Sequence, residues 1–261
     1  MVGNVTRSTD PQDYQDLPQA IGVMSKAFAD GWEIPLHNHA RDQLLFATRG
    51  IMRLRTARSA WIVPRDCAVY IPAGTDHAVH MHGDVDMRTL YISSGSGQPT
   101  PPALTVVAVS RLLRELILAL SEEPVDYAPG SRAAKIAALI EVEIGVAEPL
   151  TLSVPLPVDP RLQRVCAQLL ADLSDRRPLG AWAEAAGASS RTLARLFARE
   201  LGMGFNLWRQ RMRFQNALDL LAGGAPISNV ARRCGYNSPS AFSAAFRAVM
   251  GVAPSALSGD R

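Results

Sequence analysis

The chain has 261 residues, of which 48% are hydrophobic and 20% are charged, and this ordinary globular composition excludes a disordered chain, a collagen and a disulfide-rich scaffold. Its length predicts about two domains. The net charge of +3 is unevenly distributed: residues 1–157 carry −4 (13 Lys and Arg against 17 Asp and Glu), and residues 158–261 carry +7 (14 against 7). The basic C-terminal part therefore favours a polyanionic partner.

The N-terminal residues 1–18 are polar and predict a flexible segment, without the apolar stretch of a signal peptide. No run of 18 apolar residues follows, because Arg114 and Glu115 interrupt the most apolar helical stretch. We therefore expect a cytoplasmic protein that makes no contact with a membrane. No CxxC pair occurs, and we expect three buried thiols, at Cys67, Cys166 and Cys234.

Residues 19–98 are expected to form a β domain. Short runs rich in β-branched and aromatic residues, separated by turn residues, extend from Trp32 to Ser93. This spacing is typical of an antiparallel sandwich or barrel. Residues 95–102, rich in Gly and Pro, mark the end of the domain.

Residues 103–148 are predicted to form a helical linker with two helices, near 108–122 and 131–147. In the first helix, five apolar residues fall on one stripe: Leu112, Leu113, Leu116, Ile117 and Leu120. Such stripes serve equally well as a dimer contact or as packing against the β domain. The three prolines of residues 149–157 predict an extended linker.

A helix-turn-helix plan is predicted at residues 179–201. Gly187 breaks the first helix where a tight turn is needed, and Ser189 is a suitable N-cap for the second. The second helix is expected to bury Leu193, Leu196 and Phe197. Three arginines recur on its opposite face, because they are spaced four residues apart: Arg191, Arg195 and Arg199.

The same plan recurs at residues 226–249. Gly235 is placed for the turn, Ser238 for the N-cap, and Pro239 for the first helical position, where its missing N–H does no harm. A long helix near 205–222 is expected between the two motifs. Such a spacer holds two recognition helices about one DNA turn, roughly 34 Å, apart.

The C-terminal residues resemble the AraC/XylS family of transcription regulators. The resemblance rests on residues 187–204, 213–221 and 235–257, the last including the motif residues Gly235, Tyr236, Ser238, Phe242, Phe246, Gly251 and Pro254. It implies a DNA-binding domain over residues 158–261. Residues expected at the DNA are Ser190, Arg191, Ala194, Arg195, Arg199, Pro239, Ser240, Ser243, Ala244 and Arg247.

Arginine forks suit guanine O6 and N7, so Arg191 and Arg195 are the expected base readers. The second helix departs from the family pattern because Arg247 is its one long polar side chain, so Ser240 and Arg247 are expected to hold phosphates. For Arg199, a solvated basic face is an equal alternative.

The N-terminal β domain resembles a cupin barrel. The spacing of Gly31, His37, His39, Gln43 and Gly50 matches the first cupin motif with glutamine in place of glutamate. Residues 72–77 match the core of the second, although Asp66 replaces its opening glycine and Met81 its final asparagine. The whole chain is therefore predicted as an α+β multidomain protein: a cupin-like β-barrel, a helical linker and an all-α double helix-turn-helix.

By this resemblance His37, His39, Gln43 and His77 are candidate ligands of a divalent metal ion in the barrel. Alternatively, they line an organic-ligand pocket or satisfy one another by hydrogen bonds. His80 and His82 are expected to face outward.

The predicted function is regulation of transcription: the cupin domain senses a small molecule or a metal ion and alters binding to double-stranded promoter DNA. We do not expect an enzyme. The alternatives are a metal-dependent cupin enzyme with an appended DNA-binding domain, and a DNA binder whose barrel is an oligomerisation module.

Overall fold

The computed structural model describes residues 8–63, 67–93, 100–150, 153–172, 175–222, 224–250 and 253–256. Asp66 and Gly251, which belong to the cupin and AraC motifs, lie outside these ranges. The chain divides into two compact units, one of Met1–Arg53 and Val63–Leu150, the other of Leu54–Ile62 and Thr151–Arg261. None of the described helices is long and apolar enough to cross a membrane.

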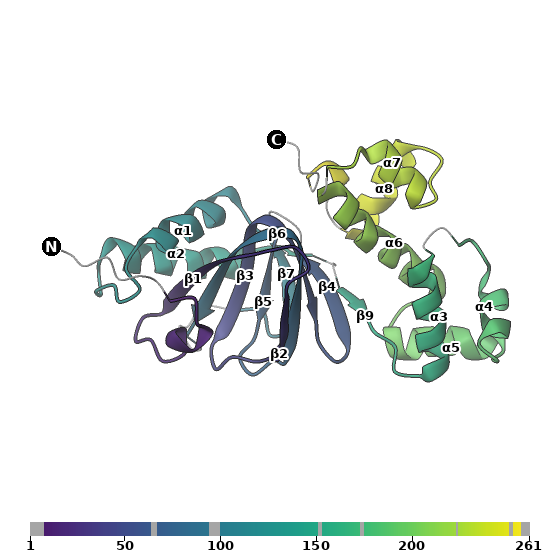
Figure 1. Ribbon diagram of the computed structural model, residues 1–261, viewed down its shortest axis with the longest axis horizontal. Helices are drawn as coiled ribbons and strands as arrows, with labels where there is room; N and C mark the ends of the chain where they lie inside the picture. Colours follow the sequence, from purple (N-terminus) through teal and green to yellow (C-terminus); the bar gives the residue numbers. More distant parts are fainter. Residues whose placement is uncertain are drawn as a thin grey trace. The chain divides into compact units, whose positions relative to one another are not determined.

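Within the described ranges, nine strands form a sheet with the order β1-β6-β3-β5-β7-β8, in which β2 pairs with β6, and β4 pairs with β3 and β9 (Figure 1). Their bounds are β1 (Ile21–Phe28), β2 (Glu33–His37), β3 (Asp42–Arg55), β4 (Ser59–Val63), β5 (Cys67–Ile71), β6 (His77–Ile92), β7 (Thr105–Ala108), β8 (Pro149–Leu150) and β9 (Ser153–Pro155). The long strand β6 pairs with β2 near its start and with β1 from Val85 to Ile92.

Two helices, α1 (Arg111–Glu122) and α2 (Arg132–Val146), pack together over the β1 side of the sheet (Figure 1). Each begins at a serine whose hydroxyl accepts a backbone N–H, Ser110 for α1 and Ser131 for α2. Their apolar faces and one face of the sheet share a core that includes Phe46 of β3. The predicted helical linker therefore packs on the sheet of its own unit. Of the five stripe residues of α1, Leu113, Leu116, Ile117 and Leu120 are buried in this contact, whereas Leu112 is 52% exposed.

The second unit is helical apart from β9 and the β4 segment. Its helices are α3 (Pro160–Ala171), α4 (Leu179–Ala185), α5 (Ser190–Leu201), α6 (Phe205–Ala222), α7 (Ile227–Arg233) and α8 (Pro239–Met250). Trp182, Phe197 and Trp208 are buried in a core made by α3, α4, α5 and the start of α6. Phe214, Phe242 and Phe246 form an aromatic cluster at the other end of α6. Two helical bundles are thus joined by one continuous helix.

Two local expectations differ from the structure. Residues 149–157, expected as an extended linker, contain the paired strands β8 and β9, because their proline-limited backbone still meets partners at sheet edges. Trp32, which the frequency of large aromatic residues in protein cores predicts to be mostly buried, is 56% exposed because it follows the turn before β2. A short segment of sequence therefore predicts the local backbone conformation, but it predicts neither the pairing partner of that segment nor the burial of its side chains.

Candidate functional site

The exposed face of α5 is defined by local sequence signals that the structure contains. Gly187 adopts φ +66° in the turn, a conformation in which a side chain is strained, and the Ser189 hydroxyl accepts the Thr192 N–H at 3.1 Å. The predicted DNA contacts lie on one exposed face, opposite the buried apolar residues: Ser190, Arg191, Ala194, Arg195 and Arg199. The first helix-turn-helix therefore presents cations to solvent on a firmly packed helix.

The second recognition helix, α8, is built in the same way. Gly235 has φ +79°, and the Ser238 hydroxyl accepts the Ala241 N–H at 3.2 Å. The outer face of α8 carries small side chains as far as Arg247. Five predicted DNA contacts lie on it, and all but the half-buried Ser243 are exposed: Pro239, Ser240, Ser243, Ala244 and Arg247. The side chains on this face of α8 are mostly short, whereas the exposed face of α5 carries three long arginine side chains.

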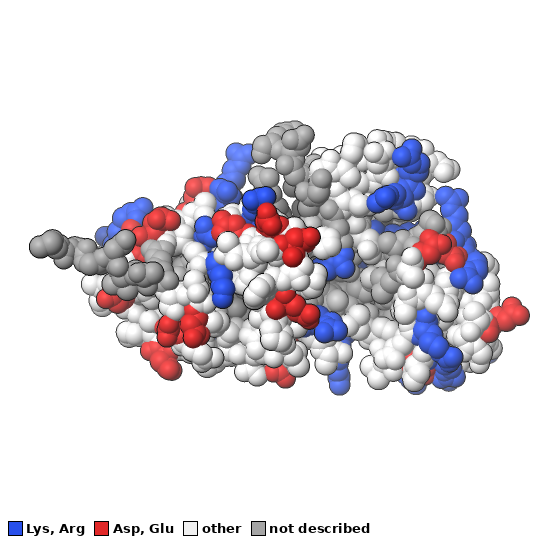
Figure 2. All heavy atoms as spheres, in the orientation of Figure 1, with Lys and Arg blue, Asp and Glu red and all other residues white. Residues whose placement is uncertain are grey.

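Basic side chains outside the recognition helices were missed by the sequence prediction. Figure 2 displays basic side chains over the helical unit, with a few acidic ones among them. Arg176, from the segment before α4, and Arg213 of α6 lie beside Gly235, and Arg209 lies one turn before Arg213 on α6. Because Arg176 is distant in the sequence from α6, only the tertiary fold brings it to these arginines.

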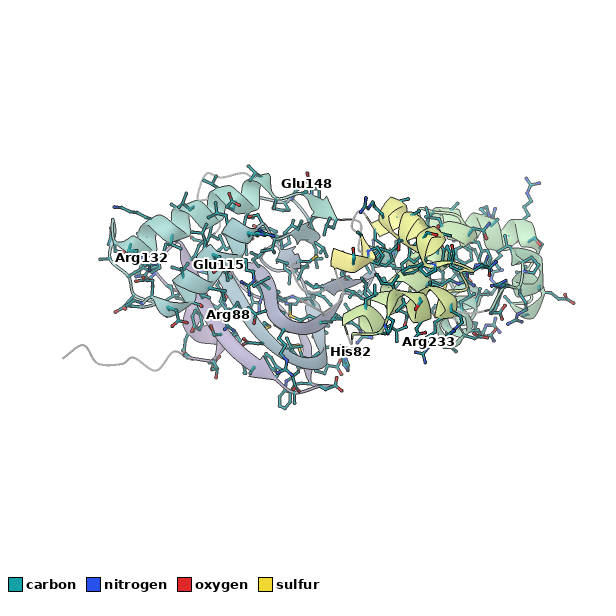
Figure 3. All side chains as sticks on the ribbon, turned by 90° about the horizontal axis from the view of Figure 1, so that it is seen from above. His82, Arg88, Glu115, Arg132, Glu148 and Arg233 are labelled. Atoms are coloured by element: carbon teal, nitrogen blue, oxygen red, sulfur yellow. The ribbon has the colours of Figure 1, made fainter. Side chains whose placement is uncertain are left out.

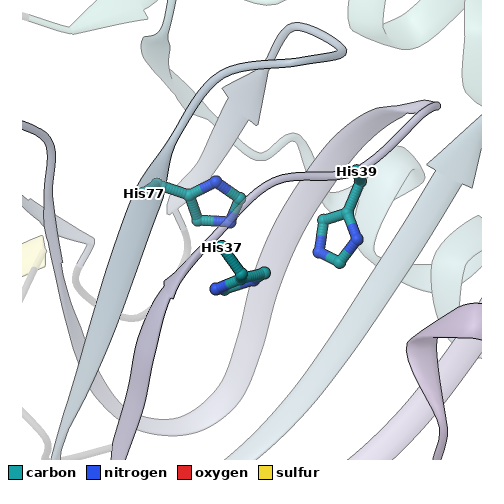
Figure 4. Close-up of side chains that lie close together, drawn as sticks. All are labelled: His37, His39 and His77. Atoms are coloured by element: carbon teal, nitrogen blue, oxygen red, sulfur yellow. The ribbon is translucent and has the colours of Figure 1, made fainter.

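The histidines of the two cupin motifs meet in the first unit (Figure 4). His37 ends β2 and is paired with His77, the first residue of β6, while His39 lies just beyond β2. The ring centroids are 4.3 Å apart for His37 and His77, 4.8 Å for His37 and His39, and 5.7 Å for His39 and His77. His82 is exposed on β6 (Figure 3), and His80 is half-buried.

Hydrogen bonds to backbone carbonyls orient two of the three rings. Nδ1 of His37 lies 2.7 Å from the Pro35 carbonyl oxygen, and Nδ1 of His77 lies 2.8 Å from that of Thr75. Since a carbonyl oxygen only accepts, Nδ1 carries the proton in both rings. In the neutral rings the Nε2 lone pair is therefore left for a ligand or a metal ion.

A cavity of about 200 Å³ lies beside the three rings. The lining of the cavity is mostly apolar and includes Met24, Phe28, Trp32, Leu45, Val79 and Met87. Besides the three histidines it contains polar side chains and the charged residues Lys26 and Glu33. Cavities of about 150 Å³ accommodate benzene, so this one has room for a single-ring molecule. An apolar wall with a small polar group is typical of ligand sites.

Four buried polar atoms on the cavity lining have no hydrogen-bond partner among the described residues: His39 Nδ1, Gln43 Oε1, His77 Nε2 and Thr89 Oγ1. Leaving such atoms unpaired costs about 1–3 kcal/mol each. A bound group that supplies partners would recover this free energy. These four atoms are therefore the polar groups of the cavity that a bound molecule could satisfy.

Burial controls the charge of the rings. It lowers the pKa of His39 to about 4, and the charges of His37 and His77 lower it further. Burial likewise lowers the pKa of His77 to about 4, against the opposing hydrogen bond to Thr75. Both rings are neutral at pH 7 and are therefore available as electron-pair donors.

The three rings have the chemistry of a metal site. One ligand atom from each of His37, His39 and His77 lies within 4.8 Å of the others, and Gln43 lines the same cavity. Imidazole nitrogens suit Zn²⁺, Cu²⁺, Fe²⁺ and Ni²⁺. Nitrogens about 2.0–2.1 Å from one ion lie roughly 3–4 Å apart, so the rings would need to close by about 1 Å.

Comparisons with known proteins find a domain family in each part of the chain. The helix-turn-helix domain family matches residues 182–259, and the cupin domain family matches residues 26–93. The HTH-type transcriptional regulator NimR of Escherichia coli is 28% identical over 90% of this chain and 86% of its own length. A putative AraC-like transcription regulator of Streptomyces antibioticus is 31% identical over 71% of this chain and 54% of its own length.

The chain is an AraC-type transcription regulator with a cupin domain. This confirms the predicted family, the β-rich N-terminal and helical C-terminal architecture, and DNA binding as the task of the C-terminal part. Among solved structures, ToxT from Vibrio cholerae covers 91% of this chain and 97% of its own, at 13% identity and a TM-score of 0.38. A likeness that low transfers neither ligand nor mechanism to the regulator.

Proposed function

We propose that the regulator reads promoter DNA with both recognition helices and responds to an effector bound in the cupin cavity. The observation that carries the effector proposal is the set of buried, unpartnered polar atoms beside the His37, His39 and His77 rings, of which His39 and His77 are neutral at pH 7. In this proposal residues 19–98 sense the effector, residues 103–148 link, and residues 158–261 bind DNA in the cytoplasm.

In the DNA-binding domain, Arg191 and Arg195 are proposed to read guanines, because their exposed guanidinium groups lie one turn apart on α5. Ser240 and Arg247 of α8 are proposed to hold phosphates. Arg199 pairs with the carboxylate of its neighbour Glu200 at 3.2 Å, and we therefore propose for it a role in the basic face of α5 rather than in base reading.

The proposed effector is a small molecule of about one ring, or a metal ion. His37, His39 and His77 would hold the ion, with Gln43 as a neutral fourth donor, and a bound ion would supply a positive charge that the neutral rings lack. An organic ligand would place hydrogen-bonding atoms at the same end and its apolar body against Met24, Leu45 and similar residues.

Regulation requires that the effector binds two arrangements of the protein with different affinity, because equal affinity shifts no population. We propose that the regulator forms a homodimer and that the dimer contact takes part in this change. Exposed apolar side chains lie on the outer faces of α1 and α2: Leu112, Leu139, Val142 and Val146. Catalysis by the cupin domain is the alternative, and it requires turnover of a substrate in addition to metal binding.

DNA reading is tested with duplexes selected by the wild-type protein from a random pool. Replacing Arg191 and Arg195 by alanine is expected to weaken the best site by about 1–3 kcal/mol for each lost base contact. Binding of random duplex should change less. If the double variant bound its best site as tightly as wild type, these residues would not be the readers.

Metal binding is tested by elemental analysis of purified protein. The wild type is expected to hold close to one equivalent of a divalent metal, and the His37→Ala/His39→Ala variant much less. Equal and negligible metal in both proteins would remove the metal proposal and leave the organic effector.

A further inference from the structure

The hydrogen-bonding polarity of the cupin cavity is defined by its buried, unpaired atoms. These atoms belong to His39, Gln43, His77 and Thr89, each of which is at most 6% exposed. Each atom donates hydrogen bonds, accepts them or does either, according to its chemistry. Together they therefore specify which hydrogen bonds a bound molecule has to supply.

His77 contributes an acceptor. Its Nδ1 lies 2.8 Å from the carbonyl oxygen of Thr75, and that oxygen only accepts, so Nδ1 carries the proton. Nε2 of the neutral ring therefore presents a lone pair. This Nε2 is one of the buried atoms without a partner in the described part of the chain.

Gln43 contributes a second acceptor. Its side-chain amide hydrogen-bonds the Tyr91 hydroxyl, whereas Oε1 has no partner among the residues that the structure describes. The NH₂ end of the amide is therefore the engaged end, and the carbonyl oxygen that remains can only accept. Because Gln43 is an amide, it presents this acceptor without a negative charge.

The other two unpaired atoms do not restrict the ligand. The Thr89 hydroxyl both donates and accepts, and Nδ1 of neutral His39 does one or the other according to the tautomer. Two of the four atoms can thus only accept, and none of the four can only donate. A molecule that satisfies all four has to bring donors.

The charged side chains on the lining do not favour an anion. Nζ of Lys26 donates to the Thr9 carbonyl oxygen at 3.3 Å and lies 5.4 Å from the centre of the Phe28 ring. Glu33 lies on the same lining and carries the opposite charge. A bound carboxylate would also place negative oxygens against the two lone pairs defined above, which is costly in a buried site.

A metal ion is the other species that takes up lone pairs, and two features of the cavity favour an organic molecule instead. His39, Gln43 and His77 are all neutral donors, so they would leave the charge of a divalent ion uncompensated. The cavity also continues from these donors along apolar side chains such as Met24 and Leu45, which an ion does not contact. A ring that carries a donor group uses both parts.

We propose that the effector is a single-ring molecule without a carboxylate that donates hydrogen bonds, through O–H or N–H, to Gln43 Oε1 and His77 Nε2. This rests on the proposed binding of an effector in the cupin cavity. The apolar body of the ring lies against the apolar lining, and the donor group distinguishes the effector from hydrocarbons of the same size.

The test compares four probes of similar size on the full-length protein after treatment with a chelator: phenol, aniline, toluene and benzoate. Toluene replaces the donor by a methyl group, and benzoate replaces it by an anion. Isothermal titration calorimetry is expected to show phenol and aniline binding at least about tenfold more tightly than toluene, because toluene leaves buried acceptors unpaired. Benzoate is expected to bind no better than toluene. A cavity that is only apolar would instead prefer toluene, the most hydrophobic probe.

Gln43→Met locates the donor contact, because methionine has a similar length and no hydrogen-bonding oxygen. This variant is expected to bind phenol about tenfold more weakly than wild type and to bind toluene at least as well. Gln168→Met is the matched control, since it makes the same change at an exposed position on α3 and should leave all affinities as in wild type. Circular dichroism checks that both variants are folded, and the wild-type comparison of the four probes does not depend on either variant.

The possible results separate this proposal from the one on which it rests. If toluene or benzoate binds wild type as tightly as phenol and aniline do, the donor proposal is wrong while the cavity remains a ligand site. A preference for phenol that Gln43→Met leaves unchanged also overturns it, because the donor then binds elsewhere. If no probe binds and the untreated protein contains a divalent metal, the ion is the effector. If no probe binds and no metal is found, the proposed effector site is wrong as well.

Discussion

In the first unit, a single buried polar side chain connects segments that are far apart in the sequence. Arg41 is 8% exposed, and its guanidinium donates to the carbonyl oxygens of Gln15, Leu17 and Gln19. It thereby fastens the segment that precedes β1 to the sheet. Nothing in the spacing of residues around Arg41 predicts this role, since its three acceptors are backbone atoms from a distant turn.

Replacing Arg41 by methionine is expected to lower the free energy of unfolding by about 3 kcal/mol, because buried carbonyl groups lose their donors. The measurement is urea denaturation followed by circular dichroism. Arg49→Met, at an exposed position on β3, is the control and should change stability by less than about 0.5 kcal/mol. Equal small changes in both variants would contradict the role assigned to Arg41.

The lowered pKa values of His39 and His77 predict acid sensitivity of the metal-free protein. Both rings have an ordinary pKa of 6.5 when unfolded and about 4 when folded, so the unfolded chain binds more protons between these values. Stability should be full above about pH 6.5 and fall as the pH decreases towards 4.

This is measured by denaturation at successive pH values in the presence of a chelator. His77→Gln should flatten the profile, whereas His82→Gln, at an exposed position, should leave it unchanged. A wild-type profile that is flat between pH 6.5 and 4 would show that burial does not control these rings.

At the scale of helices, short signals in the sequence are sufficient to predict where turns, caps and helices lie. The turns at Gly187 and Gly235 and the caps at Ser189 and Ser238 occur in the structure where the sequence predicts them. The long helix expected near 205–222 is observed as α6, Phe205–Ala222. Each of these features depends on atoms within a few residues, so no distant partner is needed to specify it.

Ser189→Ala is expected to destabilise the second unit by about 1 kcal/mol, because the Thr192 N–H at the start of α5 loses its acceptor. Thermal unfolding monitored by tryptophan fluorescence reports the change, since Trp182 and Trp208 lie in the same core. Ser190→Ala, which removes a hydroxyl one residue beyond the cap, is the control. A larger loss in the control would show that the cap is not the stabilising group.

The length of α6 predicts a fixed half-site spacing. Its 18 residues span about 27 Å as one continuous helix that joins the two motifs. Inserting about 5 bp between the half-sites turns the second one to the opposite side of the duplex, and inserting about 10 bp moves it one turn away. Both insertions should reduce affinity to that of a single half-site. Recovery at 10 bp would indicate a flexible connection or two separate protomers.

At the scale of the whole molecule, the proposed sensing site and the DNA-binding helices belong to different compact units. The cupin resemblance came from motif spacing, and the structure brings the three histidines of those motifs into one cluster. Which group binds there depends on cavity shape and on unpaired atoms, and neither is visible in a motif. Effector identity is therefore a question for measurement on the intact regulator.

If a metal ion is the effector, removing it with a chelator should change the affinity of wild-type protein for its selected duplex. The His37→Ala/His39→Ala variant should bind DNA with an affinity that the chelator does not alter, because the α5 and α8 faces are untouched. Fluorescence anisotropy measures both. An equal response of the two proteins to the chelator would show that these histidines do not transmit the signal.

Helix caps, glycine turns, apolar stripes and the spacing of two family motifs depend on neighbouring residues, and the sequence predicts them. Other features appear only in the folded protein. The fold pairs residues of the expected linker 149–157 as strands, leaves Trp32 exposed, and orients the rings of His37 and His77. It also brings Arg176 and Arg213 to Gly235. The physical reason is that local geometry specifies conformation, whereas burial and charge depend on groups that meet only when distant segments pack together.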